Sequence, residues 1–356
     1  MDYAAIDLHK KESRIRILTE AGEVVDYRIA TTREALTAVF GERAALRVLL
    51  EASTESDWVA THIESLGHEA IVADPNYAPM YGMRDRRVKT DARDTAALAD
   101  ACRQGTYRAV HRRSAAQRHQ QWALTVRDQL VRTRTRAINA SRAIVRGVGA
   151  RLPPGSREHF VARLVGVELP EAVQTTLAPL CALITHTTQA RGAIDQQLAT
   201  HAAGDAVCRR LLTAPGIGPV TAVAFVAALD TPTRFRHASQ VAQYLGLVPR
   251  EYSSGERQRR GHVLRSAHPR VQMLLVQAAW RVLRSTAPAA QPLRHWGLSV
   301  AKRRGRRIAA VAVARRLARL LWAMWRDETV FRVPVTRCPM EEQDATRPLG
   351  HPMTVR

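Results

Sequence analysis

The sequence has few cysteines and no long apolar run, and each shortage excludes a class of protein. The four cysteines, at positions 102, 181, 208 and 338, show neither a CxxC pair nor Cys/His spacing, so neither a disulfide framework nor a zinc site is expected. The apolar run at residues 308–314 is flanked by arginines and far too short to cross a bilayer, and the first residues lack an apolar stretch of signal-peptide length. We therefore expect a cytoplasmic globular protein without a membrane partner.

Acidic side chains are scarce beyond the first 80 residues. The chain has 54 Lys or Arg against 32 Asp or Glu, a net charge of +22 and a pI near 11.2. Residues 1–80 hold 8 basic and 14 acidic side chains, a net charge of −6, which leaves +28 for the remainder. A basic excess of this size predicts a polyanionic partner such as nucleic acid.

The first hundred residues alternate strand and helix patterns. Three short β-type runs are separated by polar or glycine-containing turns, which predicts a three-stranded meander. Helix and strand signals then alternate. The strand signals cover 3–9, 14–20, 23–30, 45–53 and 69–74, and the helix signals cover 32–40, 56–66 and a stretch from Thr90. This order predicts a mixed sheet with helices on its faces.

Beyond about residue 110 the pattern is helical. Residues 112–149 are a long arginine-rich helical stretch, a proline-glycine break follows at 151–156, and a second long helical stretch covers 171–203. We expect these two helices to form an antiparallel or an intermolecular coiled coil. Residues 211–327 are predicted to be mostly helical, and the last twenty or so residues to form a loose tail.

Four carboxylates stand out by their placement. Asp7 lies within an apolar strand, Glu51 closes the apolar run RVLLE, and Asp91 and Asp94 share one face in the first turn of a helix. If these elements converge, their oxygen atoms form a ligand set that suits Mg²⁺ in phosphodiester chemistry. Structural roles are the alternative: a helix-dipole partner at Asp91, an ion pair of Asp7 with a lysine, or a helix cap at Glu51.

Basic residues and two glycines are candidate phosphate contacts. Cations precede the two aspartates, surround a Ser-Ser-Gly loop at 248–266 and form a run at 301–307, and the hairpin-like segment at 214–222 would let the backbone approach a phosphate. The candidates are Arg84, Arg86, Arg87, Lys89, Gly216, Gly218, Arg250, Arg257, Arg259, Arg260, Arg265, Lys302, Arg303 and Arg304. A tight turn between core helices is the alternative for the glycines, and a solvated face is the alternative for 301–307.

The loop at 248–266 also holds a candidate nucleophile. A serine beside a glycine is usually a turn residue. Here guanidinium groups surround the serine, and they would balance the charge that develops on a phosphoryl group under attack. Ser253 and Ser254 are adjacent, which leaves a one-residue ambiguity.

Several segments together resemble the DEDD transposases of the insertion-sequence 110 family, to which the Piv-type DNA invertases are related. They are AIDLHK, LLEAS, KTDARDTAALA, LTAPGIGPVTA, FRHASQVAQYLGLVPREYSSGERQRRGHV and RRIAAVAVARRLA. The resemblance covers about residues 3–327. It implies an α/β RNase H-like (RuvC-like) catalytic domain at 1–110 and a long-helix or coiled-coil region at 111–205. A mainly α transposase domain with a helix-hairpin-helix-like element follows at 206–330, and a flexible tail at 331–356.

The resemblance also implies roles for single residues. Asp7, Glu51, Asp91 and Asp94 would be the Mg²⁺ ligands, and Ser254, directly before Gly255, the nucleophile. Family members are RNA-guided recombinases in which a noncoding bridge RNA pairs with donor and target DNA. They act as tetramers, dimers of dimers, through a covalent 5′-phosphoserine intermediate, which implies a prokaryotic protein associated with the nucleoid. At 265–268 this chain has Arg-Ser-Ala-His where the family usually has a Lys-x-Gly-Asn turn.

Two other functions stay open at the level of sequence. A metal-only junction resolvase or nuclease would use water as its nucleophile and leave no protein on the cleaved DNA. A nonenzymatic nucleic-acid-binding protein would need only the basic part of the chain, and it leaves the acidic first 80 residues unexplained.

Overall fold

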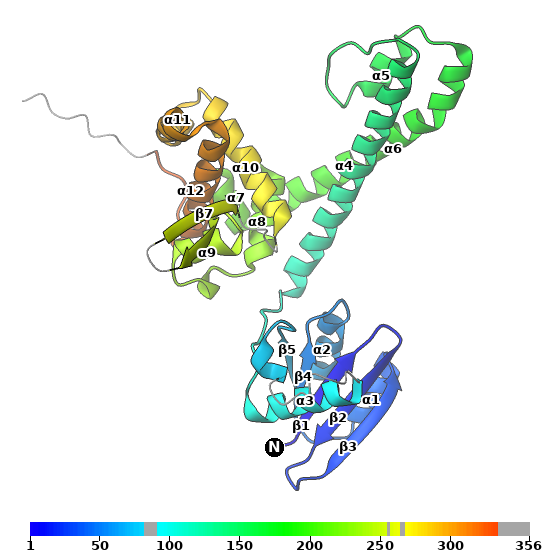
Figure 1. Cartoon of the computed structure of the whole chain (residues 1–356), viewed down its shortest axis with the longest axis vertical. Helices are drawn as coiled ribbons and strands as arrows, with labels where there is room; N and C mark the ends of the chain where they lie inside the picture. The colour runs from blue at the N-terminus through cyan, green and yellow to red at the C-terminus, as the bar shows by residue number, and fades with distance from the viewer. Residues whose placement is uncertain (82–90, 255–256, 264–267, 334–356) are drawn as a thin grey trace, which may run out of the picture. The chain divides into compact units, whose positions relative to one another are not determined.

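The computed structural model divides into two compact units, Met1–Arg113 and Ser114–Arg356 (Figure 1). The structure describes residues 1–81, 91–254, 257–263 and 268–333, and within these ranges it describes the side chains except at 91, 92, 250–254 and 257–263. Five predicted phosphate contacts lie outside the described residues. They are Arg84, Arg86, Arg87, Lys89 and Arg265.

The first unit contains one five-stranded sheet with the order β3-β2-β1-β4-β5. Its strands are β1 (Tyr3–Leu8), β2 (Glu12–Leu18), β3 (Val24–Ala30), β4 (Arg47–Glu51) and β5 (Glu69–Ala73). The first three strands form an antiparallel meander, whereas β4 pairs parallel with β1 and β5 pairs parallel with β4. The prediction of a mixed sheet that opens with a meander is therefore confirmed.

Helices cover both faces of this sheet, because the central strands present apolar side chains to both sides. α1 (Arg33–Phe40) and α2 (Ser56–Ser65) pack on the face that carries Ile6 and Leu50. The short helix η1 (Ala78–Tyr81) and α3 (Asp91–Gln104) contribute to the cluster on the opposite face. The N-terminus of α1 is set by Thr32, whose hydroxyl accepts a hydrogen bond from the backbone of Ala35, as its position before the helix predicts.

The second unit begins with two long helices that pack side by side (Figure 1). They are α4 (Ala115–Gly147) and α6 (Glu171–Gly204), and the short α5 (Phe160–Val165) lies between them in the chain. An apolar cluster that includes Ile138, Phe160 and Ile184 holds them together. Ion pairs extend along the contact, among them Arg127 Nε with Asp195 Oδ1 at 2.5 Å. These are the two long helices that the sequence predicts.

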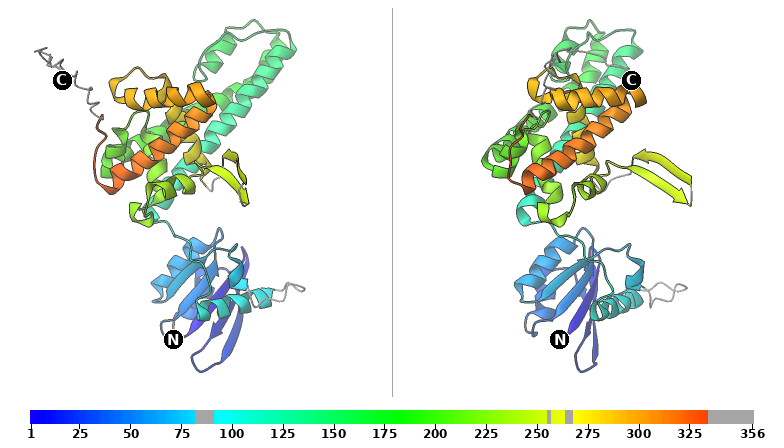
Figure 2. Two further views of the ribbon diagram at one scale, coloured as in Figure 1. Left: turned by 60° about the vertical axis from the view of Figure 1, so that its left-hand side comes forward. Right: turned by 90° about the vertical axis from the view of Figure 1, so that its left-hand side faces the viewer.

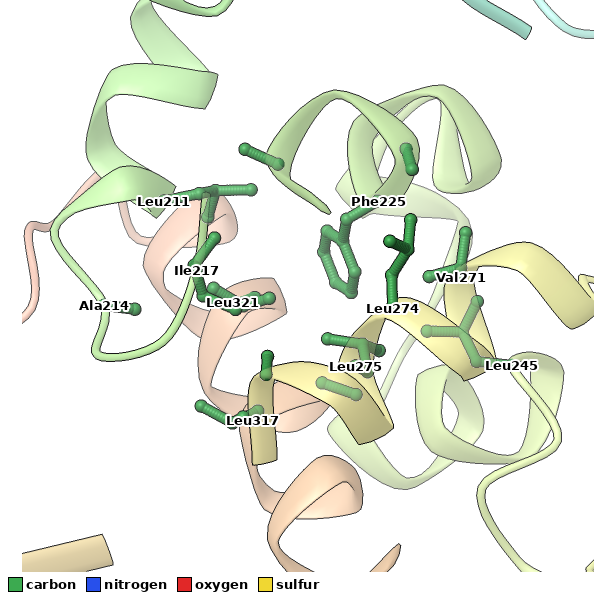
Figure 3. Close-up of a cluster of buried hydrophobic side chains, with 14 of the residues drawn as sticks. Leu211, Ala214, Ile217, Phe225, Leu245, Val271, Leu274, Leu275, Leu317 and Leu321 are labelled. Atoms are coloured by element: carbon green, nitrogen blue, oxygen red, sulfur yellow. The ribbon is translucent and has the colours of Figure 1, made fainter. Parts of the chain in front are cut away.

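The remainder of the second unit is a mainly helical body. Its helices are α7 (Ala206–Leu212), α8 (Pro219–Leu229), η2 (Pro232–Arg234), α9 (Ala238–Tyr244), α10 (Pro269–Arg284), η3 (Pro288–Ala290), α11 (Gln291–Arg304) and α12 (Arg306–Arg326). Every residue of α8 from Thr221 to Leu229 is buried, so α8 is a central core helix. Phe225 of α8 lies among Leu274 and Leu275 of α10 in this core (Figure 3). Within the described ranges, no helix has the length and apolar character needed to cross a membrane.

One element of this body differs from the sequence prediction. The segment at 248–266 was predicted to be a loop, and that prediction is wrong, because β6 (Pro249–Ser254) and β7 (Arg257–Val263) pair as a two-stranded antiparallel sheet of their own. Polar residues and a glycine occupy every position of β7 except Val263, so the segment lacks the apolar alternation by which a half-buried strand is identified. Backbone pairing between the two strands defines this hairpin.

Candidate active site

The sheet brings Asp7 and Glu51 together. The parallel ladder of β1 and β4 includes the pair Ile6–Leu50, one residue before both carboxylates. The two acidic residues therefore stand at the carboxyl ends of neighbouring strands, about 5 Å apart between Cα atoms. A slip of one residue in this register would turn one carboxylate to the opposite face.

Helix α3 covers the face of the sheet on which both carboxylates lie. Leu98 of α3 packs in one cluster with Ala5 and Leu49, which precede the two carboxylates by two residues on β1 and β4. Because side chains alternate along a strand, positions two apart share a face. Asp7 and Glu51 are thus on the α3 side of the sheet.

Asp94 lies near the start of α3, a helix that contacts β4. Cys102 Sγ donates a hydrogen bond to the carbonyl of Arg47, at the start of β4, over 3.6 Å. Asp94 lies eight residues before Cys102, roughly 12 Å along a helix, and Glu51 lies four residues after Arg47, roughly 13 Å along a strand. The two lengths are similar, so an antiparallel course of α3 against β4 would bring Asp94 level with Glu51. Asp94 itself is buried, with 9% of its surface exposed.

Neighbouring side chains hold the strand-end carboxylates. The hydroxyl of Tyr81, the last residue of η1, donates a hydrogen bond to Glu51 Oε1. His9 Nε2 lies 3.5 Å from Asp7 Oδ2, and the Asp7 side chain is only 14% exposed. The N-cap of α2 is Glu55, so Glu51 does not have the capping role that its position also allowed. Sequence patterns gave no signal for Tyr81, because it contacts a residue 30 positions earlier.

The candidate ligands are of the chemical type that a hard divalent cation prefers. Asp7, Glu51 and Asp94 supply carboxylate oxygens, the donors that Mg²⁺ prefers. Asp91 begins α3, but its side chain is outside the described part of the structure. Among the side chains that are described, no three His, Cys, Asp or Glu residues stand close enough together to hold a metal ion. The four-carboxylate site therefore remains a prediction, with two of its members aligned by the sheet.

The candidate nucleophile belongs to the second unit. Ser254 is the last residue of β6 and pairs with Arg257, while Ser253 pairs with Gln258. Directly paired residues are the closest cross-strand neighbours in an antiparallel ladder. The register thus places the backbone of a cationic residue opposite Ser254 and that of a neutral residue opposite Ser253. The predicted phosphate contacts Arg250, Arg259 and Arg260 lie on the same two strands.

The turn between α7 and α8 contains both glycines that were candidate phosphate contacts. Gly216 has a φ of +78°, and a Cβ atom there would stand 2.8 Å from the carbonyl oxygen of Ala278 on α10. Close packing of α10 thus accounts for this glycine. Gly218 is the N-cap of α8, and the nearest atom to its Cβ position, at 3.8 Å, is Arg281 Nη1. A phosphate contact at either glycine remains a prediction.

Replacing Gly216 with alanine is expected to destabilise the second unit by about 2–4 kcal/mol, from the left-handed backbone and the clash together. Gly192 in α6 is the matched control, because it has no such φ value and nothing within 4 Å of its Cβ position. Gly192→Ala is expected to stabilise the helix by about 0.5–1 kcal/mol. The test compares the melting temperatures of the two variants in thermal unfolding. Equal melting temperatures would contradict the packing role of Gly216.

The cationic run at 301–307 spans the corner between α11 and α12. Lys302, Arg303 and Arg304 are exposed in the last turn of α11, where cations complement the helix dipole. Arg306 and Arg307 are exposed in the first turn of α12, where cations oppose the dipole. A role in helix stability thus explains the first three cations and not the last two.

Two family models match the chain. One, described as "Transposase IS116/IS110/IS902 family", matches residues 208–294, and a DEDD model of the IS110 type, described as "Transposase", matches residues 4–149. The first match contains Ser254, and the second contains all four carboxylates.

Curated relatives cover most of the chain. A protein of Pseudomonas aeruginosa described as a probable family 20 transposase is 32% identical over 292 residues, which cover 80% of this chain and 85% of that protein. The transposase for insertion sequence element IS1328 of Yersinia enterocolitica is 27% identical, with 92% and 97% covered. The transposase for element IS1111A of Coxiella burnetii is 24% identical, with 92% and 90% covered.

Proposed function

This chain belongs to the IS116/IS110/IS902 family of DEDD transposases, and from that premise we propose an RNA-guided recombinase that cleaves and exchanges DNA strands through a Mg²⁺-dependent serine reaction. As a transposase it is an enzyme that acts on DNA. The proposal concerns how it does so: which residues hold the metal, which atom attacks phosphorus and which partner supplies sequence specificity.

The observation that carries the proposal is the register of β1 and β4, which aligns Asp7 and Glu51 on the face covered by α3. These two carboxylates, with Asp94 and Asp91 from α3, would hold the metal. Bound there, Mg²⁺ would supply positive charge beside the scissile phosphate, so that the local charge around the acidic cluster would change from negative to positive. Tyr81, which donates to Glu51, would keep one carboxylate oriented.

Ser254 would attack the phosphate. The Oγ–P bond forms as the P–O3′ bond breaks, which leaves a 5′-phosphoserine link and releases a 3′-hydroxyl that takes up a proton, while the serine proton passes to a base. The pairing of Ser254 with Arg257 supports this assignment over Ser253, because a guanidinium group stabilises the charge on the phosphoryl oxygens. A later attack by a 3′-hydroxyl on the phosphoserine would restore the serine and join the strands.

The larger architecture is proposed in the same terms. The strand order β3-β2-β1-β4-β5 supports an RNase H-like first domain at 1–110, and the paired α4 and α6 support a coiled-coil region at 111–205 that joins protomers into a tetramer. A transposase domain at 206–330 and a tail at 331–356 complete the division. The net charge of +22 supports binding of donor DNA, target DNA and a noncoding bridge RNA, at the nucleoid.

A metal-only resolvase or nuclease is the second candidate, because the aligned carboxylates would suffice for attack by water. The two reactions differ in their products. Cells that carry the gene with its genomic flanks supply both DNA and RNA partners, and DNA recovered from them without protease treatment carries protein on its 5′ ends only under the serine mechanism. Free 5′ phosphates alone would favour the second candidate.

The cationic run at 301–307 offers a separate test of nucleic-acid binding. Replacing Arg306 and Arg307 with alanine is expected to lower the affinity for nonspecific duplex DNA and to reduce the slope of log K against log salt by about 0.9 for each phosphate that is no longer neutralised. The melting temperature should hold or rise, because two cations leave a helix N-terminus. Arg142→Ala on α4, where the guanidinium lies over the ring of Phe160, is the control for removal of a cation elsewhere. If the slope of log K against log salt is unchanged in the double variant, the cationic run is a solvated face and not a DNA contact.

A further inference from the structure

The β6–β7 hairpin leaves the helical body between two aromatic residues. Tyr244 ends α9, five residues before β6 begins, and His268 precedes α10, five residues after β7 ends. Their rings stack with centroids 4.4 Å apart and planes inclined by 40°. The contact thus lies at the base of the segment that carries Ser254. Figure 2 shows the two strands of this segment extending from the helices of the second unit.

Tyr244 is anchored to the core on its other side. Its hydroxyl donates a hydrogen bond over 3.4 Å to the carbonyl of Ala228, near the end of α8. Its ring centroid lies 5.2 Å from the ring centroid of Phe235. Arg234 lies over both rings, with Cζ 5.2 Å from each centroid. The Nη1 group of the same arginine donates to the carbonyl of Leu229 over 2.7 Å. The stack is therefore fixed to the C-terminal end of the central core helix.

A second contact joins the same two segments. Gln272 of α10 donates from Nε2 to the carbonyl of Gly246, over 2.6 Å, two residues after Tyr244. Both ends of the hairpin are thus tied to each other and to the core. Beyond these two contacts, β6 and β7 are hydrogen-bonded to each other and form a sheet separate from the five-stranded one.

We propose that the stacked rings of Tyr244 and His268 are positioning residues, which set the direction of the β6–β7 hairpin and hence the place of Ser254. The inference rests on the proposed role of Ser254. Five residues separate Pro249 from Ser254, roughly 17 Å of strand, so a tilt of about 10° at the base moves the end by about 3 Å. Attack on phosphorus tolerates far less displacement, since a misplacement of about 1 Å can cost on the order of 100-fold in rate.

The first test measures the hairpin itself, without chemistry. Hydrogen exchange of the peptide covering 249–263 in the full-length protein is expected to accelerate at least fivefold in His268→Ala, with the melting temperature nearly unchanged because His268 is half-exposed. His268→Phe keeps an aromatic ring and is expected to exchange like the wild type. Trp122→Ala removes a comparable ring pair with His119 on α4 and is the matched control. Unchanged exchange in His268→Ala would overturn the proposal.

The second test asks whether the two rings act as one contact. Tyr244→Leu is expected to accelerate exchange of the same peptide, and the double variant with His268→Ala should add little to either single change, because all three break the same stack. Fully additive effects would overturn the proposal. Should one single variant fail to fold, the other single variant and His268→Phe still decide it.

The third test connects position to reaction. In cells that carry the gene with its genomic flanks, the yield of protein–DNA adduct is expected to fall at least tenfold in His268→Ala and to stay within twofold of wild type in His268→Phe. An adduct yield unaffected by His268→Ala would overturn the positioning role. An adduct that survives in Ser254→Ala would instead overturn the proposed role of Ser254, and the exchange measurements would still test whether the ring stack positions the hairpin.

Discussion

Ser254→Ala is expected to abolish the covalent protein–DNA adduct, with a loss on the order of 10³-fold or more, as removal of a nucleophile gives in other enzymes. The change removes one oxygen from the end of β6 and leaves the backbone pairing with Arg257 intact. Fold and nonspecific DNA affinity should therefore persist. Adducts are counted as DNA retained with protein after denaturation.

Ser253→Ala is the matched control for this prediction. It removes the same atom one position earlier, where the paired residue is Gln258, and is expected to keep most of the adduct. If Ser253→Ala abolishes the adduct while Ser254→Ala retains it, the register argument is wrong and the nucleophile is the neighbouring serine. Adducts in both variants would exclude this hairpin as the source of the nucleophile.

Asp7→Asn is expected to remove DNA cleavage to a similar extent, because the amide keeps the shape of the side chain and loses the charge that binds a cation. A readout that needs no DNA follows from linkage: at about 100 times its Kd, a ligand of the folded state stabilises it by about 2.7 kcal/mol. Mg²⁺ should therefore raise the melting temperature of the wild-type protein and have little effect on that of the variant.

Asp26→Asn is the control of equal charge. Asp26 lies on β3, where its two oxygens accept hydrogen bonds from Arg16 at 2.7 Å, so its loss affects an ion pair and not the strand ends of β1 and β4. The variant should keep cleavage and the response to Mg²⁺. Equal Mg²⁺ stabilisation of wild type and Asp7→Asn would show that the ion binds elsewhere.

The strands and helices of the first unit were predictable because each follows a simple rule. β1 and β4 are short apolar runs bounded by polar residues, and α1 begins behind a threonine that caps it. The candidate carboxylates could be selected for the same reason, since an acidic residue interrupts or ends an apolar strand. That Asp7 and Glu51 are neighbours depends on strand order, which local pattern does not specify.

The contacts that hold the site were not predictable in this way. Tyr81 reaches Glu51 across 30 residues, and Tyr244 reaches His268 across a hairpin that the sequence presents as a loop. Such pairs form because tertiary packing brings distant segments together, and their residues carry no periodic signal. The hairpin itself was missed because β7 has polar residues or glycine at every position but the last, so it shows no two-residue apolar period.

The most direct measurement is mass spectrometry of the peptide that bears the nucleotide, compared between wild type and Asp7→Asn. Joint action of the carboxylates and the serine predicts a 5′-nucleotide on Ser254 in wild-type protein with Mg²⁺, and none in Asp7→Asn or after chelation. The same modified peptide at wild-type yield in Asp7→Asn would contradict it.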